Sequence, residues 1–337
     1  MAVSLAQAKL NATDDVEIQV IDEFRKNNFI LDALTFHDVV SGTGLGATLT
    51  YGYQRVITQA DAAFRAINSE YTPGEAAKQR YSVDLKPLGG SFQIDRVLDG
   101  VAQAAETSFQ MSQKIKATAA KFNDEVVNGD TAVDADGFDG LSKAITGSST
   151  EYLPLDNGVS AGYIDLSAST AYDTEAEWHA VLDHIDAFLG LLDGQPGALL
   201  MNGKLKAKLV SIARRAGFWT RDRNEFGVPV DAYNGIPLVD LGDKAGSTNP
   251  VVGLFSRDAD DAGAGGSITN LTDLYAVRFG LDGFHGASMA GRPLVRTWLP
   301  DFTTAGAVKT GEVEMGPVAT VLKATKAAGV LRNFKVA

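Results

Sequence analysis

The stretch SGTGLGATLTYGYQR, residues 41–55, has the glycine spacing of a dinucleotide-binding loop. Gly42, Gly44 and Ala47 fit the pattern G-x-G-x-x-G/A, which leads into a helix whose N-terminus holds the pyrophosphate. The residues after Ala47 instead alternate as in a strand, so no helix is available there. We therefore interpret the glycines as a bend before a strand. A nucleotide-dependent oxidoreductase is an alternative that rests on these glycines alone.

A second candidate for chemistry is the run GASMA, residues 286–290, which is close to the G-x-S-x-G turn that presents a nucleophilic serine. Arg292 and Pro293 follow at once and leave no room for the helix that this turn requires. The triad order of such hydrolases also places a histidine after the serine, and all four histidines precede Ser288. We predict no catalytic residue and no enzyme activity.

Candidate metal ligands are equally incomplete. His179 and His184 are five residues apart in a predicted helix, so they point to different faces. Asp134, Asp136 and Asp139 resemble part of a calcium loop, but the D-x-D-x-D-G spacing and the glutamate at the twelfth position are missing. The chain has no cysteine, which excludes thiolate sites and disulfides. We expect no metal and no cofactor.

The composition of the 337 residues restricts the partners. With 30 basic and 42 acidic residues the net charge is −12, which argues against a surface that grips nucleic acid through its phosphates. The lack of cysteine favours a reducing compartment such as the cytoplasm. The first residues do not have the pattern of a signal peptide, and no run reaches the ~18 apolar residues of a membrane span. We expect no membrane partner.

A long two-stranded arm is the most distinctive predicted element. Alternating residues from about Thr48 and again up to Lys86 predict two strands, and Thr72-Pro73-Gly74 between them indicates a turn. Such an arm would extend roughly 30–40 Å. Because an isolated two-stranded ribbon is marginally stable in water, we expect this arm to lie on another surface.

Helices and further strands follow the arm. One long helix is predicted over 95–128, ending at Asn128-Gly129, and a shorter acidic helix over 13–27 precedes the arm. Thr174 with Glu177 predicts a capped helix, and Asn202 caps the next one after the buried strand GALLMN. The runs IPLVDL, VVGLF and DLYAVRFGL and most of the tail from residue 295 to 336 predict strands. The residues that we expect on the buried stripe of the long helix are Val101, Ala105, Ser108, Ile115, Ala119, Phe122 and Val126.

This order of elements resembles the major capsid proteins of tailed phages, which have the α+β Hong Kong 97-type capsid fold. The run SVDLKPLGGSFQIDRVLDG with the long helix resembles the strand that leads into the family's spine helix, and GFDGLSKAI resembles the segment that leaves it. GALLMNGKLKAKLVSIARRAGFW and YNGIPLVDL resemble the strand, helix and G-x-P strand of the axial domain. LYAVRFGLDG and the C-terminal strands resemble the return to the peripheral domain.

The resemblance implies a division of the chain. It implies an N-terminal arm over 1–30, an extended loop over 48–81, an axial domain over 151–294, and a discontinuous peripheral domain, with its spine helix over 95–128, made of 31–47, 82–150 and 295–337.

The resemblance also implies a function. Subunits would assemble as pentamers and hexamers into an icosahedral shell around packaged double-stranded DNA, in the host cytoplasm, and become part of the virion. A separate scaffolding protein, a portal and a decoration protein are the implied partners, and an encapsulin shell with a protein cargo is the alternative within this fold. The candidates for contacts between subunits are Arg55, Phe64, Arg65, Ile67, Tyr71 and Arg80.

Overall fold

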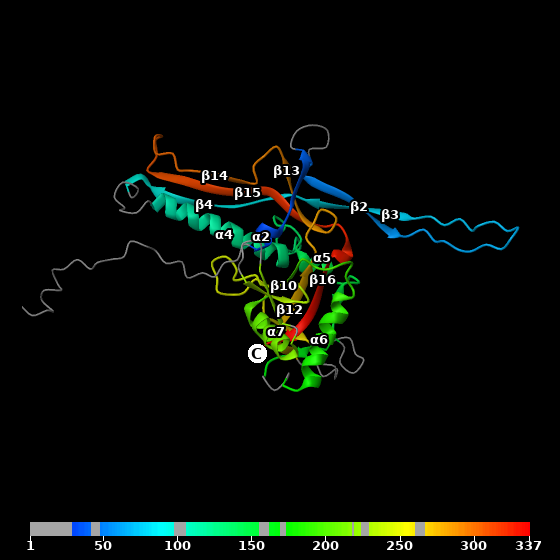
Figure 1. Cartoon of the computed structure of the whole chain (residues 1–337). Helices are drawn as coiled ribbons and strands as arrows, with labels where there is room; N and C mark the ends of the chain where they lie inside the picture. The colour runs from blue at the N-terminus through cyan, green and yellow to red at the C-terminus, as the bar shows by residue number, and fades with distance from the viewer. Residues whose placement is uncertain are drawn as a thin grey trace, which may run out of the picture.

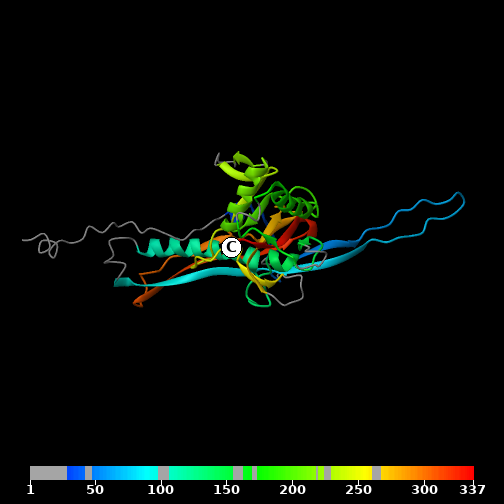
Figure 2. The same ribbon diagram turned by 90° about the horizontal axis from the view of Figure 1, so that it is seen from below.

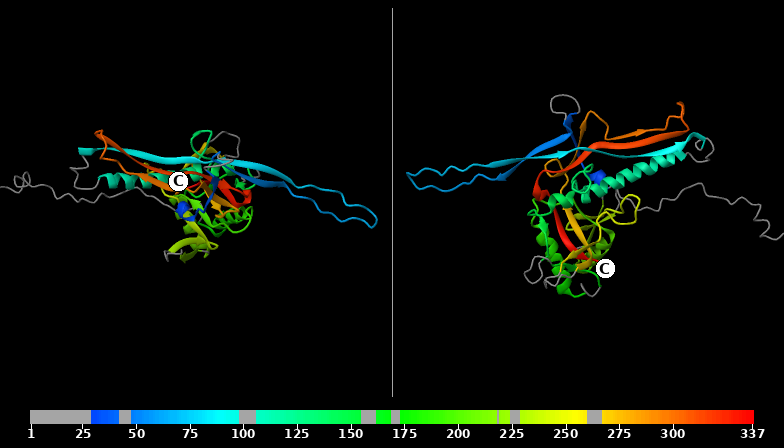
Figure 3. Two further views of the ribbon diagram at one scale, coloured as in Figure 1. Left: turned by 90° about the horizontal axis from the view of Figure 1, so that it is seen from above. Right: turned by 180° about the vertical axis from the view of Figure 1, so that it is seen from behind.

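Strands that lie far apart in the sequence form one extended layer. The computed structural model describes residues 29–41, 48–97, 106–154, 162–168, 173–217, 219–223, 229–259 and 267–337. Figure 1 shows an elongated layer of strands with a lobe of helices and strands below it. In Figures 2 and 3 the hairpin of β2 and β3 and the helix α4 (Glu106–Asn128) extend toward opposite ends of this layer. The predicted helix over 13–27 and the bend at 42–47 lie outside the described residues.

The layer is a five-stranded sheet arranged around one long strand. Its strands are β1 (Phe36–Ser41), β4 (Lys86–Asp95), β13 (Phe284–Ala290), β14 (Val295–Trp298) and β15 (Val308–Leu322). The first part of β15 pairs with β4 and β14, and its last residues pair with β13, which also pairs with β1. The helix α4 packs against β4 and β15 (Figure 1).

The structure describes the second part of the predicted long helix and little of its beginning. Residues up to Asp95 belong to β4, where Phe92 and Ile94 are buried and the residues between and beside them are less so. This two-residue period carries the strand up to Asp95, the first residue of the predicted helix. Arg96 and Val97 are helical, and residues 98–105, with the predicted stripe residues Val101 and Ala105, lie outside the described residues. The helix α4 then runs from Glu106 to Asn128, where the predicted helix ends.

The buried stripe of α4 is predicted correctly in its second half and wrongly in its first. Phe122 and Val126 are both 0% exposed, whereas Ile115 is 43% exposed and Met111 is buried. The ring of Phe122 lies against Phe36 and Phe138, so several elements enclose this half of the helix. In the first half, Met111 packs on Phe92 of β4 and Val313 of β15.

Replacing Phe122 by alanine should lower the free energy of unfolding by about 3–5 kcal/mol, because the change leaves a cavity in an enclosed aromatic cluster. The matched control Ile115→Ala, on the same helix, should cost less than about 1 kcal/mol, because that residue is already 43% exposed. Urea unfolding of unassembled subunits measures both. Equal losses for the two variants would contradict this assignment of the helix faces.

The lobe below the layer is built on a nine-stranded sheet. Its central strands run in the order β16, β12, β7, β10, β9 and β8, while β5 and β6 pair with β16 and β11 pairs with β12. Its elements are β5 (Glu151–Tyr152), β6 (Ile164–Asp165), β7 (Ala198–Met201), β8 (Trp219–Arg223), β9 (Pro229–Tyr233), β10 (Ile236–Asp240), β11 (Phe255–Asp258), β12 (Ser267–Val277) and β16 (Ala328–Lys335). The shorter helices are α2 (Phe29–Ala33), α5 (Leu141–Ile145), α6 (Glu175–Leu189), α7 (Gly203–Ala216) and the 3-10 helix η2 (Thr325–Ala327).

Both predicted helix caps are confirmed. The Glu177 carboxylate accepts a hydrogen bond of 2.9 Å from the Thr174 backbone N–H at the start of α6. The Asn202 side chain accepts one of 2.9 Å from the Leu205 N–H at the start of α7. The helix α6 ends at Leu189.

The predicted strand VVGLF is wrong, because β11 begins only at Phe255. Val251 and Val252 are fully buried, as a strand would be, but their carbonyls do not join a ladder. The side-chain amides of Asn128 and Asn202 donate to them, at 2.7 and 3.1 Å. This apolar run is therefore buried as a loop, and the side chains of two asparagines hydrogen-bond its main-chain carbonyls.

Strand pairing crosses the predicted domain boundaries. β13 lies in the predicted axial range 151–294 but pairs in the five-stranded sheet, and β16 lies in the predicted peripheral range 295–337 but pairs with β12 in the nine-stranded sheet. The chain thus passes between the two sheets after both β12 and β15. The boundary at 294/295 has to be replaced by these two crossings, and the rest of the division stays a prediction.

A buried charge network joins four strands of the nine-stranded sheet. The fully buried carboxylate of Asp273 on β12 accepts hydrogen bonds from both terminal nitrogens of Arg257, at 2.6 and 2.7 Å, and from Arg332, at 3.0 Å. Arg332 on β16 also donates to Glu151 on β5. Two guanidinium groups thereby compensate a carboxylate that has no access to water.

The variant Asp273→Ala should lose about 3–5 kcal/mol of stability, because it leaves Arg332 buried without this partner. The control Asp282→Ala removes the exposed ion pair with Arg278 and should leave the unfolding midpoint nearly unchanged. Denaturant unfolding of both variants checks this. A midpoint for Asp273→Ala that equals the wild-type value would show that the network does not carry stability.

Candidate assembly surfaces

The hairpin of β2 (Thr50–Thr58) and β3 (Ala77–Asp84) confirms the predicted arm. The two strands form a separate two-stranded sheet that pairs from Thr50 opposite Asp84 to Thr58 opposite Ala77. Figures 1 and 3 show this hairpin projecting past the end of the layer, with its tip away from the rest of the subunit. The residues from 59 to 76, which we call the tip, continue without strand pairing.

The root of the hairpin is bound firmly to the subunit. The Tyr53 hydroxyl donates to the Leu322 carbonyl at 3.1 Å, and the Arg55 Nε donates to the Lys323 carbonyl at 2.8 Å. The Arg55 guanidinium also lies 4.6 Å above the centre of the Tyr81 ring, and Tyr53 and Tyr81 stack with centroids 5.7 Å apart. Burial raises the pKa of Tyr53 above its usual value.

These contacts give Arg55 a role that the sequence prediction missed. We expected it to contact another subunit, and within its own subunit its hydrogen-bond acceptors are the main-chain carbonyls of Leu322 and Lys323 and the Tyr53 hydroxyl. Backbone acceptors far along the chain leave no signal in the sequence. Arg80, on the exposed side of β3, instead extends over Gly52.

The tip exposes its apolar side chains almost completely. Phe64 is fully exposed, Ile67 is 91% exposed and Tyr71 is 64% exposed. Arg65 lies 5.2 Å from the centre of the Tyr71 ring and donates to the Ala66 and Ser69 carbonyls, so its contacts remain within the tip. The structure therefore brings four of the predicted contact residues together in the tip and places Arg55 and Arg80 on the paired strands.

A second exposed apolar group lies at the opposite end of the layer. Four large side chains are exposed there, where β4 and β14 end and β15 begins: Val97, Trp298, Leu299 and Val308. Next to them, β4 contributes Gly89, Gly90 and Ser91 to a shallow groove whose other side carries Glu312 and Glu314 of β15. Sequence reasoning missed this surface, because a strand pattern does not say which face of a sheet stays uncovered.

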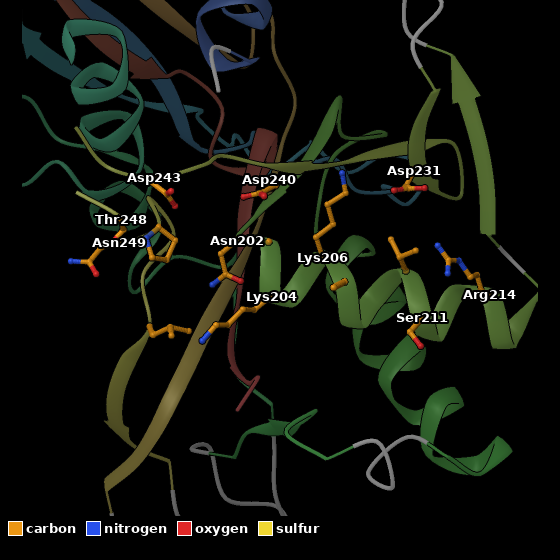
Figure 4. A pocket seen from close by; sticks show the side chains of 15 residues that line it. Asn202, Lys204, Lys206, Ser211, Arg214, Asp231, Asp240, Asp243, Thr248 and Asn249 are labelled. Atoms are coloured by element: carbon orange, nitrogen blue, oxygen red, sulfur yellow. The ribbon is translucent and has the colours of Figure 1, made fainter. Parts of the chain in front are cut away.

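A groove lies beside α7, and Figure 4 shows the side chains that line it. Its charged side chains are interleaved: Lys204, Lys206 and Arg214 come from α7, and Asp231, Asp240 and Asp243 come from β9, β10 and the following loop. Neither sign of charge therefore dominates the lining of the groove. Among the described residues no group of three histidine, aspartate or glutamate side chains has the arrangement of a metal site.

None of the described helices combines the length and the apolar character that crossing a bilayer requires.

Comparisons with known proteins identify the fold. No protein-family model matches the sequence, and no curated protein matches it. The holo-SrpI encapsulin complex from Synechococcus elongatus PCC 7942 is similar with a TM-score of 0.61 and 15% identity, over 100% of this chain and 97% of that one. The capsid of a native GTA particle is similar with a TM-score of 0.59 and 15% identity, over 98% and 97% of the two chains.

A phage capsid has the same architecture. The capsid of Myoviridae phage XM1 is similar with a TM-score of 0.53 and 14% identity, and the match covers 98% of this chain and 99% of that one. These likenesses extend over nearly the whole length of each chain. The chain therefore has the Hong Kong 97-type capsid fold of tailed-phage major capsid proteins, a mixed α+β fold, as its order of elements predicted.

Replacing Arg55 by alanine should loosen the hairpin root. Charged hydrogen bonds contribute about 1.5–3 kcal/mol each, so amide hydrogen exchange over residues 50–58 should become roughly tenfold faster or more. The control Arg80→Ala, on the exposed side of the same hairpin, should leave this exchange unchanged. If both variants exchange like the wild type, the contacts with Leu322 and Lys323 do not hold the hairpin.

Proposed function

We propose that this chain is a major capsid protein whose copies assemble as pentamers and hexamers into an icosahedral shell around phage double-stranded DNA. The observation that carries the proposal is the tip, which leaves Phe64, Ile67 and Tyr71 uncovered at the end of a firmly rooted hairpin. A chain with the capsid fold is completed when a neighbouring copy covers these side chains.

The energetics of the contact favour apolar burial over ion pairs. Burying a side chain such as Phe64 or Ile67 contributes about 1.5–3 kcal/mol, whereas an exposed ion pair contributes about 0–1 kcal/mol. The apolar side chains would therefore supply the affinity, and charges would set the orientation. Arg65 of the tip and Arg80 of β3 are the cations available for this purpose. Glu312 and Glu314, in the shallow groove of the five-stranded sheet, would supply the matching carboxylates on a neighbouring copy.

The net charge of −12 is consistent with a wall that confines DNA without binding it tightly. In this proposal the protein is assembled in the cytoplasm of the bacterial host and becomes part of the virion. A scaffolding protein, a portal and a decoration protein are the partners that a phage shell requires in addition.

An encapsulin-type compartment is the second candidate, because an encapsulin complex is among the structures that share this fold. The content of purified particles separates the two proposals. Nucleic acid protected from nuclease inside large particles supports the phage capsid, and small shells that are empty or hold a protein cargo support the compartment.

Replacing Thr58 to Ala76 with a short Asn-Gly turn should leave each subunit folded, with near-normal circular dichroism, because the tip makes few contacts with its own subunit. The same variant should form no closed shells in electron micrographs. Exchanging Phe64, Ile67 and Tyr71 for serine should act similarly, whereas Glu70→Gln in the same tip should preserve assembly. Intact shells of normal size without the tip would refute its proposed role.

A further inference from the structure

A buried histidine without a hydrogen bond lies beneath the hairpin root. His285 on β13 is 0% exposed, and neither of its ring nitrogens has a hydrogen-bond partner in the described structure. Buried polar groups are nearly always paired, so an unpaired ring in the interior of a sheet requires an explanation. No element of the proposed shell contact uses this residue.

Two side chains from other strands close the pocket around His285. The Tyr51 ring of β2 lies 5.8 Å from the His285 ring, and the His37 ring of β1 lies 6.0 Å from it, both in edge-on arrangements. The Tyr51 hydroxyl and the His37 Nδ1 are 3.2 Å apart, within hydrogen-bond distance. Tyr51 is the buried residue with which the hairpin enters the layer, so this pocket lies where β1, β2 and β13 meet.

A cationic group lies beside these rings. The Lys323 ammonium group is 5.7 Å from the centre of the Tyr51 ring. Lys323 after β15 and His37 of β1 are the charged or titratable groups that act on His285, and the Tyr51 ring of β2 packs on it. A proton on His285 would place a charge in an apolar pocket beside these cationic or titratable groups.

We propose that the pocket of His37, Tyr51 and His285 is an acid-sensitive latch for the hairpin. While His285 is neutral, Tyr51 packs on it and the root stays closed. A protonated His285 needs water, and water reaches it only when Tyr51 moves away. Acidification therefore loosens the root of β2 and β3 without unfolding the two sheets.

The direction of the pH dependence follows from linkage. Burial, together with Lys323 and His37, lowers the pKa of His285 from 6.5 to about 4, and a contact with the Gly283 backbone opposes this only in part. The closed state therefore binds fewer protons than an open state with an ordinary histidine. Its stability is fully present above pH 6.5 and is lost as the pH falls from 6.5 toward 4.

Hydrogen exchange of unassembled full-length subunits at pH 7.5 and pH 5.5 tests the latch, with rates corrected for intrinsic exchange. With pKa values of about 4 closed and 6.5 open, opening of the segments 50–58 and 77–84 should increase roughly tenfold at pH 5.5. This pH remains above the isoelectric point of 4.8, so charge still keeps the subunits apart. The variant His285→Phe should abolish the increase, and the control His179→Gln on α6 should retain it.

A direct measurement keeps the test decisive if His285→Phe fails to fold. Exchange of the histidine C2 proton, followed by mass spectrometry of the wild-type protein, reports the titration of each histidine separately. Titration of His285 below about pH 5 supports the latch, and titration near pH 6.5, or a hairpin with the same exchange at both pH values, overturns it. Because subunits are measured before assembly, this result is independent of whether shells form.

Discussion

The backbone hydrogen-bond ladder of β15 is the interaction on which the rest of the structure depends. Residues 308–318 of this strand pair with β4, and residues 318–322 pair with β13. At the end of β15, the carbonyls of Leu322, its last paired residue, and of Lys323 hold the hairpin through Tyr53 and Arg55. One strand thus positions α4, the neighbouring strand β13 and the root of the arm. A small tilt at this root becomes a large displacement at the tip.

Some of the large apolar side chains are buried within the subunit, and others are exposed at its two ends. Phe122 and Val126 are enclosed within the subunit, and their burial offsets the conformational entropy that is lost when α4 is ordered. Phe64 and Ile67 at one end of the layer, and Leu299 at the other, remain uncovered. Exposed apolar groups at two remote ends suit a protein that meets more than one neighbour, whereas a single patch would suit a dimer.

Strand alternation and helix caps predicted their elements correctly, whereas features that depend on distant partners, such as the loop at Val251 and Val252, were not predicted. Alternation predicted the hairpin, and the caps at Thr174 and Asn202 predicted two helices, because each signal lies within a few residues. Ile115 was assigned to the core because periodicity does not show where a sheet ends. In the candidate site the exposed tip could be predicted, whereas the role of Arg55 could not, since its carbonyl acceptors lie 267 and 268 residues away.

The attachment of the hairpin through main-chain oxygens has a consequence for variation of the sequence. Any residue at position 323 supplies the same carbonyl to Arg55, but its side chain decides which charge stands over Tyr51. The main-chain oxygen of Lys323 therefore anchors the hairpin, while its side-chain ammonium group supplies the charge beside Tyr51. Mutational drift at this position, or deliberate redesign, can adjust the acidity at which the arm is released while the strength of its anchorage stays as it was.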